Sequence, residues 1–207
     1  LRQEALALHP DEQAVELADG SRIAYRGLVV AAGIKLDWNA IPGLAGTLGE
    51  HGVTSNYRYD LAPYTRDLVQ ALKPGVALFT QPPMPIKCAG APQKAMYLSC
   101  HAWEREHRLG AIDVEFHNAG AALFGVADYV PALMRYIERY GIDLRLGSTL
   151  IEVDGPGRRA VFRQGAGERS QTCERRFDML HAVPPQVAPD FIANSALADA
   201  TGFVAVD

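Results

Sequence analysis

The sequence predicts an α/β protein built on a doubly wound parallel sheet. Three observations support this fold class. Short apolar runs typical of buried strands alternate with segments of helical period, glycine or proline separates most of them, and the 207 residues are 48% hydrophobic, which suits one large or two small cores. Strands that alternate with helices in this way pair in parallel, because each helix returns the chain to the end of the sheet where the previous strand began, so that the next strand runs in the same direction.

The N-terminal region predicts short strands joined by turns. Strands over residues 5–8 and 14–17 flank a polar segment, and a turn follows at 18–21. The continuous apolar run over 28–32, which ends at Gly33, predicts a central parallel strand buried on both faces. Residues 35–60 contain four glycines and Pro42 without a sustained period, so we expect a crossover into a second domain there.

The middle of the chain carries the alternation of strands and helices. Leu61, Tyr64, Leu68 and Leu72 share one helical face, and Pro74-Gly75 stops this helix. Further along we expect a strand over 76–80, a helix from 91 to 108, a strand over 112–116, a helix capped by Asp128 and closed by Gly141, and a hairpin over 149–153 and 159–162. The apolar strand over 177–183 is expected to return to the first domain. The expected domains are therefore 1–44, 45–165 and 166–207, the first and last being segments of one domain.

Charge and motifs exclude several functional classes. The net charge of −4, without runs of like charge, argues against nucleic-acid binding or a polybasic membrane patch. No apolar stretch approaches the ~18 residues of a membrane span, and no signal-peptide order is present. The six histidines lack metal-site spacing, and no G-x-S-x-G elbow of a hydrolase occurs. The chain begins at Leu1 and stops just after another apolar run, so we expect an internal piece of a longer protein.

The loop over residues 81–90 is the most promising place for chemistry, because ligands and reactive groups of α/β proteins gather after a parallel strand. It has three prolines and one late glycine, so it lacks the G-x-G-x-x-G that brings a backbone close to a dinucleotide. It delivers Cys88 just before a helix N-terminus, beside Lys87 and near Lys94, where a thiolate is favoured. Cys88 is thus a candidate nucleophile; the alternative is a small apolar filler at a turn.

The three cysteines fit neither a disulfide framework nor a zinc site. Cys100 lies twelve residues beyond Cys88, in the same predicted helix. That is about 15 Å along the helix axis, beyond the ~7 Å between Cα atoms that a disulfide spans. We therefore expect Cys100 to fill the core, and Cys173, in a polar stretch, to be an incidental surface thiol.

Three segments of the sequence carry a resemblance to a known family. They are Ile86-Lys87-Cys88-Ala89-Gly90-Ala91-Pro92-Gln93-Lys94, Leu123-Phe124-Gly125-Val126, and Met179-Leu180-His181-Ala182-Val183-Pro184-Pro185. Together they closely resemble the sulfide:quinone oxidoreductases of the mitochondrial-like type, in the superfamily of FAD-dependent pyridine nucleotide-disulfide oxidoreductases. The K-C-A-G-A-P-Q-K run is the specific part. Residues 25–33 resemble the strand before the A-T-G turn of these flavoproteins, with Ala31-Ala32-Gly33 in its place.

The resemblance implies a Rossmann-like second domain of dinucleotide-binding type, flanked by partial segments of an FAD-binding domain. It implies that Ala31, Ala32 and Gly33 let the backbone approach FAD, whose other binding segments lie outside this chain. It further implies that sulfide opens a disulfide between Cys88 and a cysteine beyond Asp207, leaving a persulfide. Two electrons then pass from the released thiolate, which we assign to Cys88, through FAD to a quinone, and the sulfane sulfur leaves to a low-molecular-weight thiol or another acceptor.

Supporting roles and location follow from the same resemblance. Lys87 and Lys94 are assigned electrostatic support of the thiolate, against the alternative that they are solvated lysines at a helix start. The full-length parent is expected to be peripheral on a bacterial inner membrane, with membrane contact only through a C-terminal region, whereas the isolated piece is expected to be soluble and inactive. The competing functions are an NAD(P)H-dependent quinone or disulfide reductase of the same fold, and a catalytically silent domain.

Overall fold

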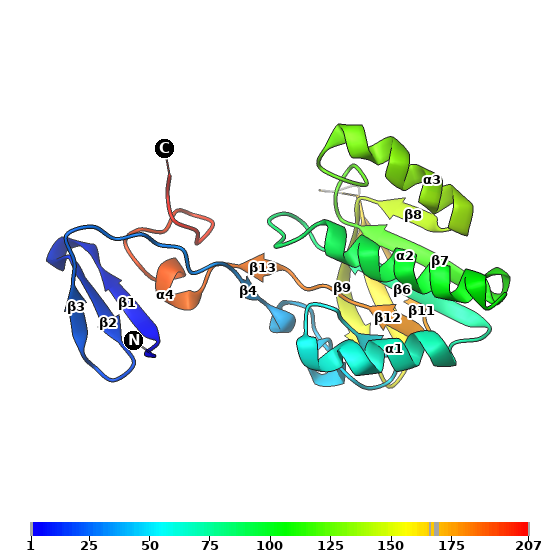
Figure 1. Cartoon of the computed structure of the whole chain (residues 1–207), viewed down its shortest axis with the longest axis horizontal. Coiled ribbons are helices and arrows are strands. Elements are labelled where there is room, and N and C mark those ends of the chain that lie inside the picture. Colours follow the sequence, from blue (N-terminus) through cyan, green and yellow to red (C-terminus); the bar gives the residue numbers. More distant parts are fainter. Residues whose placement is uncertain (1, 166, 168–169, 207) are drawn as a thin grey trace. The chain divides into compact units, whose positions relative to one another are not determined.

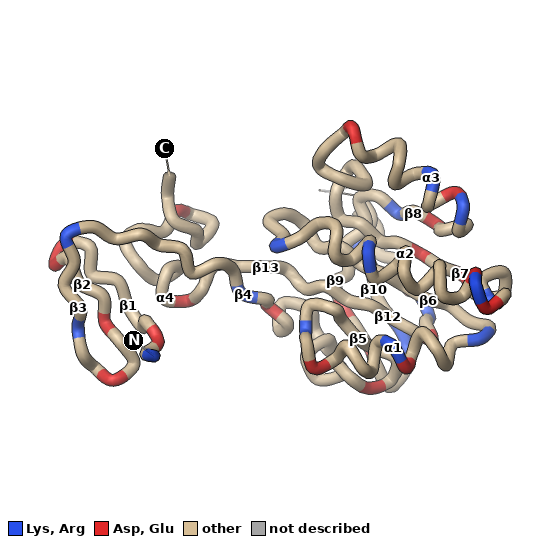
Figure 2. The backbone as a smooth tube through the Cα atoms, viewed as in Figure 1, with Lys and Arg blue, Asp and Glu red and all other residues tan. Residues whose placement is uncertain are grey.

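The computed structural model describes residues 2–165, 167 and 170–206. The chain divides into two compact units. The first comprises Leu1–Leu36 and Gln186–Asp207, and the second comprises Asp37–Pro185. Both units carry Lys and Arg interspersed with Asp and Glu (Figure 2). None of the helices formed by the described residues is long and apolar enough to cross a membrane.

The first unit contains an antiparallel sheet of three strands in the order β1-β2-β3. The two predicted N-terminal strands are confirmed as β1 and β2, which a 3₁₀ turn at Pro10–Glu12 connects. Residues distant in the sequence also pair here, because β4 and β13 run antiparallel to each other. The bounds are β1 Ala5–His9, β2 Ala14–Leu17, β3 Arg22–Ala24, β4 Lys35–Leu36, β13 Gln186–Val187 and the short helix α4 Asp190–Ala193.

The predicted central strand over residues 28–32 is wrong for this chain. The segment has no regular structure, and the Val29 side chain is 89% exposed. An apolar run becomes a central strand only where strands on both sides supply hydrogen bonds, and no described strand pairs with this segment.

The second unit confirms the predicted parallel α/β sheet. Five parallel strands follow the order β5-β12-β6-β7-β8, and β6 pairs with β7 in register from Gly75↔Ile112 to Gln81↔Asn118. The strands are β5 Val53–Thr54, β6 Gly75–Gln81, β7 Ile112–Asn118, β8 Asp143–Leu146 and β12 Met179–His181; the helices are α1 Ala62–Ala71, α2 Gly90–Arg105 and α3 Val130–Tyr140.

The parallel sheet lies between two layers (Figure 1). The three helices cover one face, and an antiparallel meander of β9, β10 and β11 covers the other. Side chains alternate accordingly along β6: Ala77 and Phe79 join the core beneath the helices, whereas Leu78 joins the core beneath the meander. The meander strands are β9 Ser148–Asp154, β10 Arg159–Gln164 and β11 Gln171–Arg176.

Several expected elements differ in detail. The apolar strand after residue 176 does not return to the first unit, because β12 pairs in parallel with both β5 and β6. The second compact unit therefore runs over 37–185 rather than the expected 45–165. Strand β11 forms in a segment expected to be merely polar, since it is the outer strand of the meander. Asp128 does not cap α3; it lies in a 3₁₀ turn, and Tyr129 occupies the cap position. Gly141 closes α3 in the left-handed region at φ 62°, as predicted.

Candidate functional site

Polar side chains gather where parallel strands of the second unit end. Strands β5, β6, β7 and β12 end at Thr54, Gln81, Asn118 and His181, all of which are buried. The Gln81 amide donates a hydrogen bond of 3.4 Å to the Asn118 side-chain oxygen. The carboxyl edge of such a sheet is where α/β proteins bind ligands, so this edge is the candidate site.

Cys88 lies at this edge, in the loop that joins β6 to α2. It is a free, exposed cysteine and precedes Gly90, the first residue of α2, by two positions. The unpaired N–H groups and the dipole of a helix N-terminus favour negative charge nearby. The structure thus agrees with the location expected from the sequence, while the redox role of Cys88 stays a prediction.

Two lysines are predicted to support Cys88. Lys87 lies in the loop that contains Cys88, and Lys94 lies in α2, the helix that follows this loop. Both are exposed. Lys87 is next to Cys88 in the chain, and Lys94 lies within the first turns of α2. Exposed lysines act as screened charges, so their electrostatic support of a thiolate stays a prediction as well.

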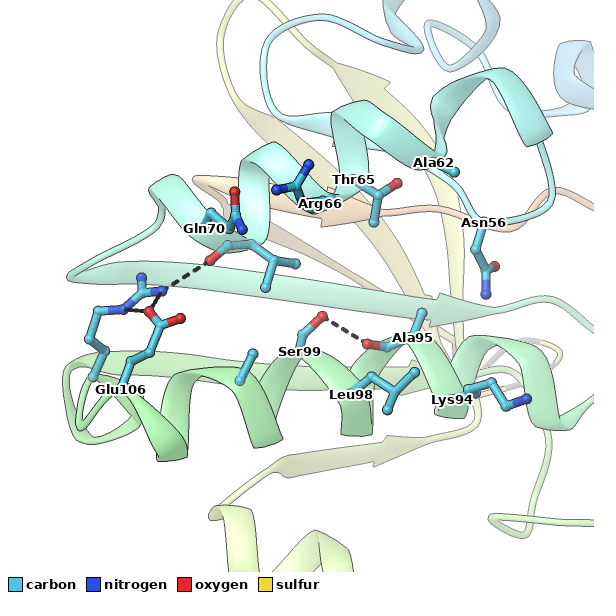
Figure 3. Close-up of a pocket in the computed structure, with 13 residues that line it drawn as sticks. Asn56, Ala62, Thr65, Arg66, Gln70, Lys94, Ala95, Leu98, Ser99 and Glu106 are labelled. Atoms are coloured by element: carbon cyan, nitrogen blue, oxygen red, sulfur yellow. Dashed lines mark hydrogen bonds and ion pairs between the residues drawn. The ribbon is translucent and has the colours of Figure 1, made fainter.

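A groove of about 420 Å³ runs between α1 and α2 (Figure 3). Asn56, Thr65 and Arg66 border it on one side, and Lys94 and Leu98 border it on the other. A second groove, of about 390 Å³, lies on the other side of α2. Its lining is largely apolar and consists of Gly90, Gln93, Lys94, Tyr97, Leu98, Phe124, Tyr129 and Leu133.

The other two cysteines are separate from this edge. Cys100 is fully buried in the core beneath the helices, as predicted, and burial raises the pKa of its thiol to about 12. A thiol with such a pKa is neutral and inert at neutral pH. Cys173 is half-buried on β11 rather than a plain surface thiol.

Ala31, Ala32 and Gly33 lie in the first unit, whereas Cys88 lies in the second. All three are exposed in an irregular segment. Gly33 has φ 73°, a left-handed backbone conformation that residues with a side chain rarely adopt, and beyond its two chain neighbours no residue has an atom within 4 Å of the position where a Cβ would stand. The segment therefore presents open backbone to any group placed against it.

Sequence reasoning missed three residues that contact the Cys88 loop or support those contacts. The Tyr57 hydroxyl donates to the Cys88 carbonyl at 2.6 Å, and the Asn56 amide donates to the Ala91 carbonyl at 3.0 Å. His181 Nε2 lies 2.9 Å from the Asn56 backbone nitrogen. Only His181 carried a signal in the sequence, as part of the M-L-H-A-V-P-P segment.

His181 is completely buried at the end of β12. Its ring stacks on Phe79 with centroids 5.8 Å apart, and its Nδ1 has no hydrogen-bond partner among the described residues. Burial lowers the pKa of His181 to about 4, so the ring is neutral at neutral pH. This histidine is therefore not a surface residue. It also differs from a typical core histidine, in which both ring nitrogens have hydrogen-bond partners.

A metal centre has no candidate ligands in the described parts of the chain, which hold no group of three His, Cys, Asp or Glu side chains arranged for one. The meander layer does contain a chain of hydrogen bonds from Ser148 through His117 to Glu115. Ser148 is fully buried, so it is inaccessible to a substrate and the chain of bonds is structural.

Comparison with known proteins shows which proteins this chain is similar to. No protein-family model matches the chain. The mitochondrial sulfide:quinone oxidoreductase of Dictyostelium discoideum is 40% identical over 201 residues, which are 96% of this chain and 43% of that protein. The corresponding protein of Schizosaccharomyces pombe is 40% identical over 205 residues, 97% of this chain and 44% of the relative. The chain thus spans less than half of the length of the curated relatives it matches.

The fold is likewise similar to a solved structure. The sulfide:quinone oxidoreductase of the hyperthermophilic bacterium Aquifex aeolicus superimposes with a TM-score of 0.79 at 17% identity, over 99% of this chain and 47% of that chain. At this identity the likeness speaks for the fold alone. The sequence identities confirm the resemblance predicted above: over nearly its whole length, this chain is a homologue of the sulfide:quinone oxidoreductases.

Proposed function

We propose that this chain is part of a flavin-dependent sulfide:quinone oxidoreductase and that Cys88 is one of its two redox cysteines. One observation carries the proposal: an exposed cysteine stands at the start of α2, at the carboxyl edge of the parallel sheet, in a chain 40% identical to proteins of that name. Cys100 is too deeply buried for this role. The partner cysteine belongs to the remainder of the full-length protein.

The proposed reaction begins with hydrosulfide attack on the disulfide between Cys88 and its partner. A new S–S bond forms, the old one breaks, and the products are a persulfide that keeps the hydrosulfide proton and a Cys88 thiolate. An acceptor thiolate then takes the sulfane sulfur. Over the whole cycle, hydrosulfide, one acceptor thiolate, one quinone and one proton give a persulfide anion and a quinol. FAD supplies the two-electron relay between the cysteine pair and the quinone.

The described residues of the first unit fit a contribution to the flavin site. Ala31 and Ala32 have small exposed side chains, and Gly33 offers open space on its Cα. Such a segment lets a flat ring approach the backbone closely. We propose that the first unit contributes to the FAD-binding domain, and that the second unit is the domain of dinucleotide-binding type that presents Cys88.

Lys87 and Lys94 complete the proposed site as electrostatic support. Each places a positive charge near the start of α2, where it adds to the helix dipole in favouring a thiolate over a thiol. Because both side chains are exposed, each contribution is modest and declines with added salt.

The proposal is tested by sulfide-dependent quinone reduction in the flavin-loaded full-length protein. The Cys88→Ser variant is expected to lose at least about a thousandfold in turnover, because serine forms neither a disulfide nor a stable leaving group. Cys173→Ser is the matched control and should keep turnover within about twofold. A Cys88→Ser enzyme that turns over at the rate of the control would refute the proposal.

A further inference from the structure

One short loop donates side-chain hydrogen bonds to both ends of the turn that contains Cys88. The Tyr57 hydroxyl donates to the Cys88 carbonyl at 2.6 Å, and the Asn56 side-chain amide donates to the Ala91 carbonyl at 3.0 Å. The turn is closed internally by a bond of 3.1 Å from the Ala91 N–H to the Cys88 carbonyl. Three hydrogen bonds therefore fix the backbone at Cys88 and at the first turn of α2.

The donor loop is itself held by the sheet. It follows β5 directly, and the Asn56 backbone nitrogen lies 2.9 Å from His181 Nε2 at the end of β12. The same ring nitrogen lies 2.9 Å from the Asn56 side-chain oxygen, so the histidine tautomer decides which of the two contacts is a hydrogen bond. In either tautomer the ring contacts Asn56.

His181 provides this contact at a cost. Its Nδ1 is buried without a partner in the described part of the chain, which costs about 1–3 kcal/mol. An apolar side chain stacked on Phe79 would avoid that cost but would leave Asn56 without its anchor. Packing alone therefore does not explain a histidine at this buried position, whereas its contact with Asn56 does.

We propose that Tyr57 and Asn56, anchored by His181, are positioning residues that hold the Cys88 sulfur at the N-terminus of α2. The inference rests on the proposed redox role of Cys88. The effect of a helix N-terminus on a charge falls away within about one turn, so a loop that drifts from the helix loses the stabilisation of its thiolate. Hydrogen bonds to the backbone prevent that drift while leaving the sulfur itself exposed.

The test is the pH dependence of Cys88 alkylation by iodoacetamide in the 207-residue chain, read by mass spectrometry of the Cys88 peptide. Tyr57→Phe removes only the hydroxyl. We expect the profile to move to higher pH, so that the alkylation rate at pH 7 falls about threefold. Asn56→Ala, which removes the second donor, is expected to act in the same direction.

Matched controls separate positioning from a general loss of stability. Tyr59→Phe makes the same chemical change two residues away on a side chain that is 96% exposed, and it should leave the Cys88 profile unchanged. Cys173 is read in the same samples and should keep its profile in every variant. The thermal unfolding midpoint of Tyr57→Phe should match that of Tyr59→Phe.

The inference is overturned if Tyr57→Phe and Asn56→Ala both give the Cys88 profile of the Tyr59→Phe control. This outcome is distinct from failure of the proposed function. A Cys88→Ser enzyme that still oxidises sulfide refutes the redox role whatever the alkylation profiles show. An unchanged profile together with an inactive Cys88→Ser enzyme refutes the positioning role alone.

Discussion

The His117 ring stacks on the Phe162 ring with centroids 3.6 Å apart and planes 14° from parallel, which joins β7 of the parallel sheet to β10 of the meander. Both ring nitrogens of His117 have partners: Nδ1 lies 2.8 Å from the Ser148 hydroxyl, and Nε2 lies 3.0 Å from the Glu115 carboxylate. Glu115 in turn accepts a bond of 3.1 Å from Arg175 on β11. The meander is thus fixed to the sheet by a satisfied polar cluster as well as by apolar packing.

Glu115→Gln is expected to destabilise the second unit by about 1–3 kcal/mol, because Arg175 loses its charged partner at a largely buried position. The measurement is urea unfolding followed by tryptophan fluorescence, which reports on the second unit because it contains both Trp38 and Trp103. The matched control, Glu174→Gln, disrupts the exposed pair with Arg159 and should change stability by only about 0–1 kcal/mol. Equal effects of the two variants would contradict the structural role of the cluster.

Acid is expected to destabilise the second unit partly through His181. Burial lowers the pKa of His181 from 6.5 to about 4, so the fold favours the neutral ring. In the unfolded chain the His181 ring takes up a proton below pH 6.5, whereas in the folded chain it does so only near pH 4. The free energy of unfolding is therefore highest above pH 6.5 and falls by up to roughly 3 kcal/mol as the pH drops from 6.5 through about 4.

The same fluorescence assay, run from pH 7.5 to pH 4, checks this contribution. The His181→Asn variant should be less stable at pH 7.5 yet show a shallower decline in stability. His101→Gln, which alters a half-exposed histidine, should decline as steeply as the unaltered chain. A His181→Asn decline as steep as that of the unaltered chain would show that His181 does not titrate as its burial requires.

The three thiols are expected to differ sharply in reactivity. Exposed Cys88 should react with a thiol reagent in the native chain at least about a thousandfold faster than Cys100, which is fully buried and whose pKa burial raises to about 12. Half-buried Cys173 should fall between them. Peptide mass spectrometry during a labelling time course measures each rate, and labelling in denaturant provides the reference in which all three react. Native labelling of Cys100 as fast as Cys88 would contradict the packing of α2.

Elements defined by local signals could be predicted from the sequence. The period of the apolar residues and the stop signals Pro74-Gly75 and Gly141 defined the series from α1 to α3, because strand and helix periods differ and glycine adopts the left-handed conformation. The position of Cys88 before a helix followed from the same signals.

Features that depend on distant partners could not be predicted. The run over residues 28–32 has strand composition but finds no partner strand, and the placement of β12 between β5 and β6 depends on pairings more than a hundred residues apart. The contact of Tyr57 with the Cys88 loop joins residues 31 positions apart and leaves no pattern in the sequence. The charged pair Glu115 and Arg175 likewise becomes recognisable only once the meander is folded.

The central claim, that Cys88 accepts the electrons of sulfide, is tested most directly by anaerobic flavin reduction in the flavin-loaded full-length protein. Sulfide should bleach the flavin absorbance within a single turnover, Cys88→Ser should abolish this bleaching, and Cys173→Ser should leave it intact. NADH should bleach neither the unaltered protein nor the variants at a comparable rate. Bleaching by NADH alone, or bleaching by sulfide that survives Cys88→Ser, would contradict the claim.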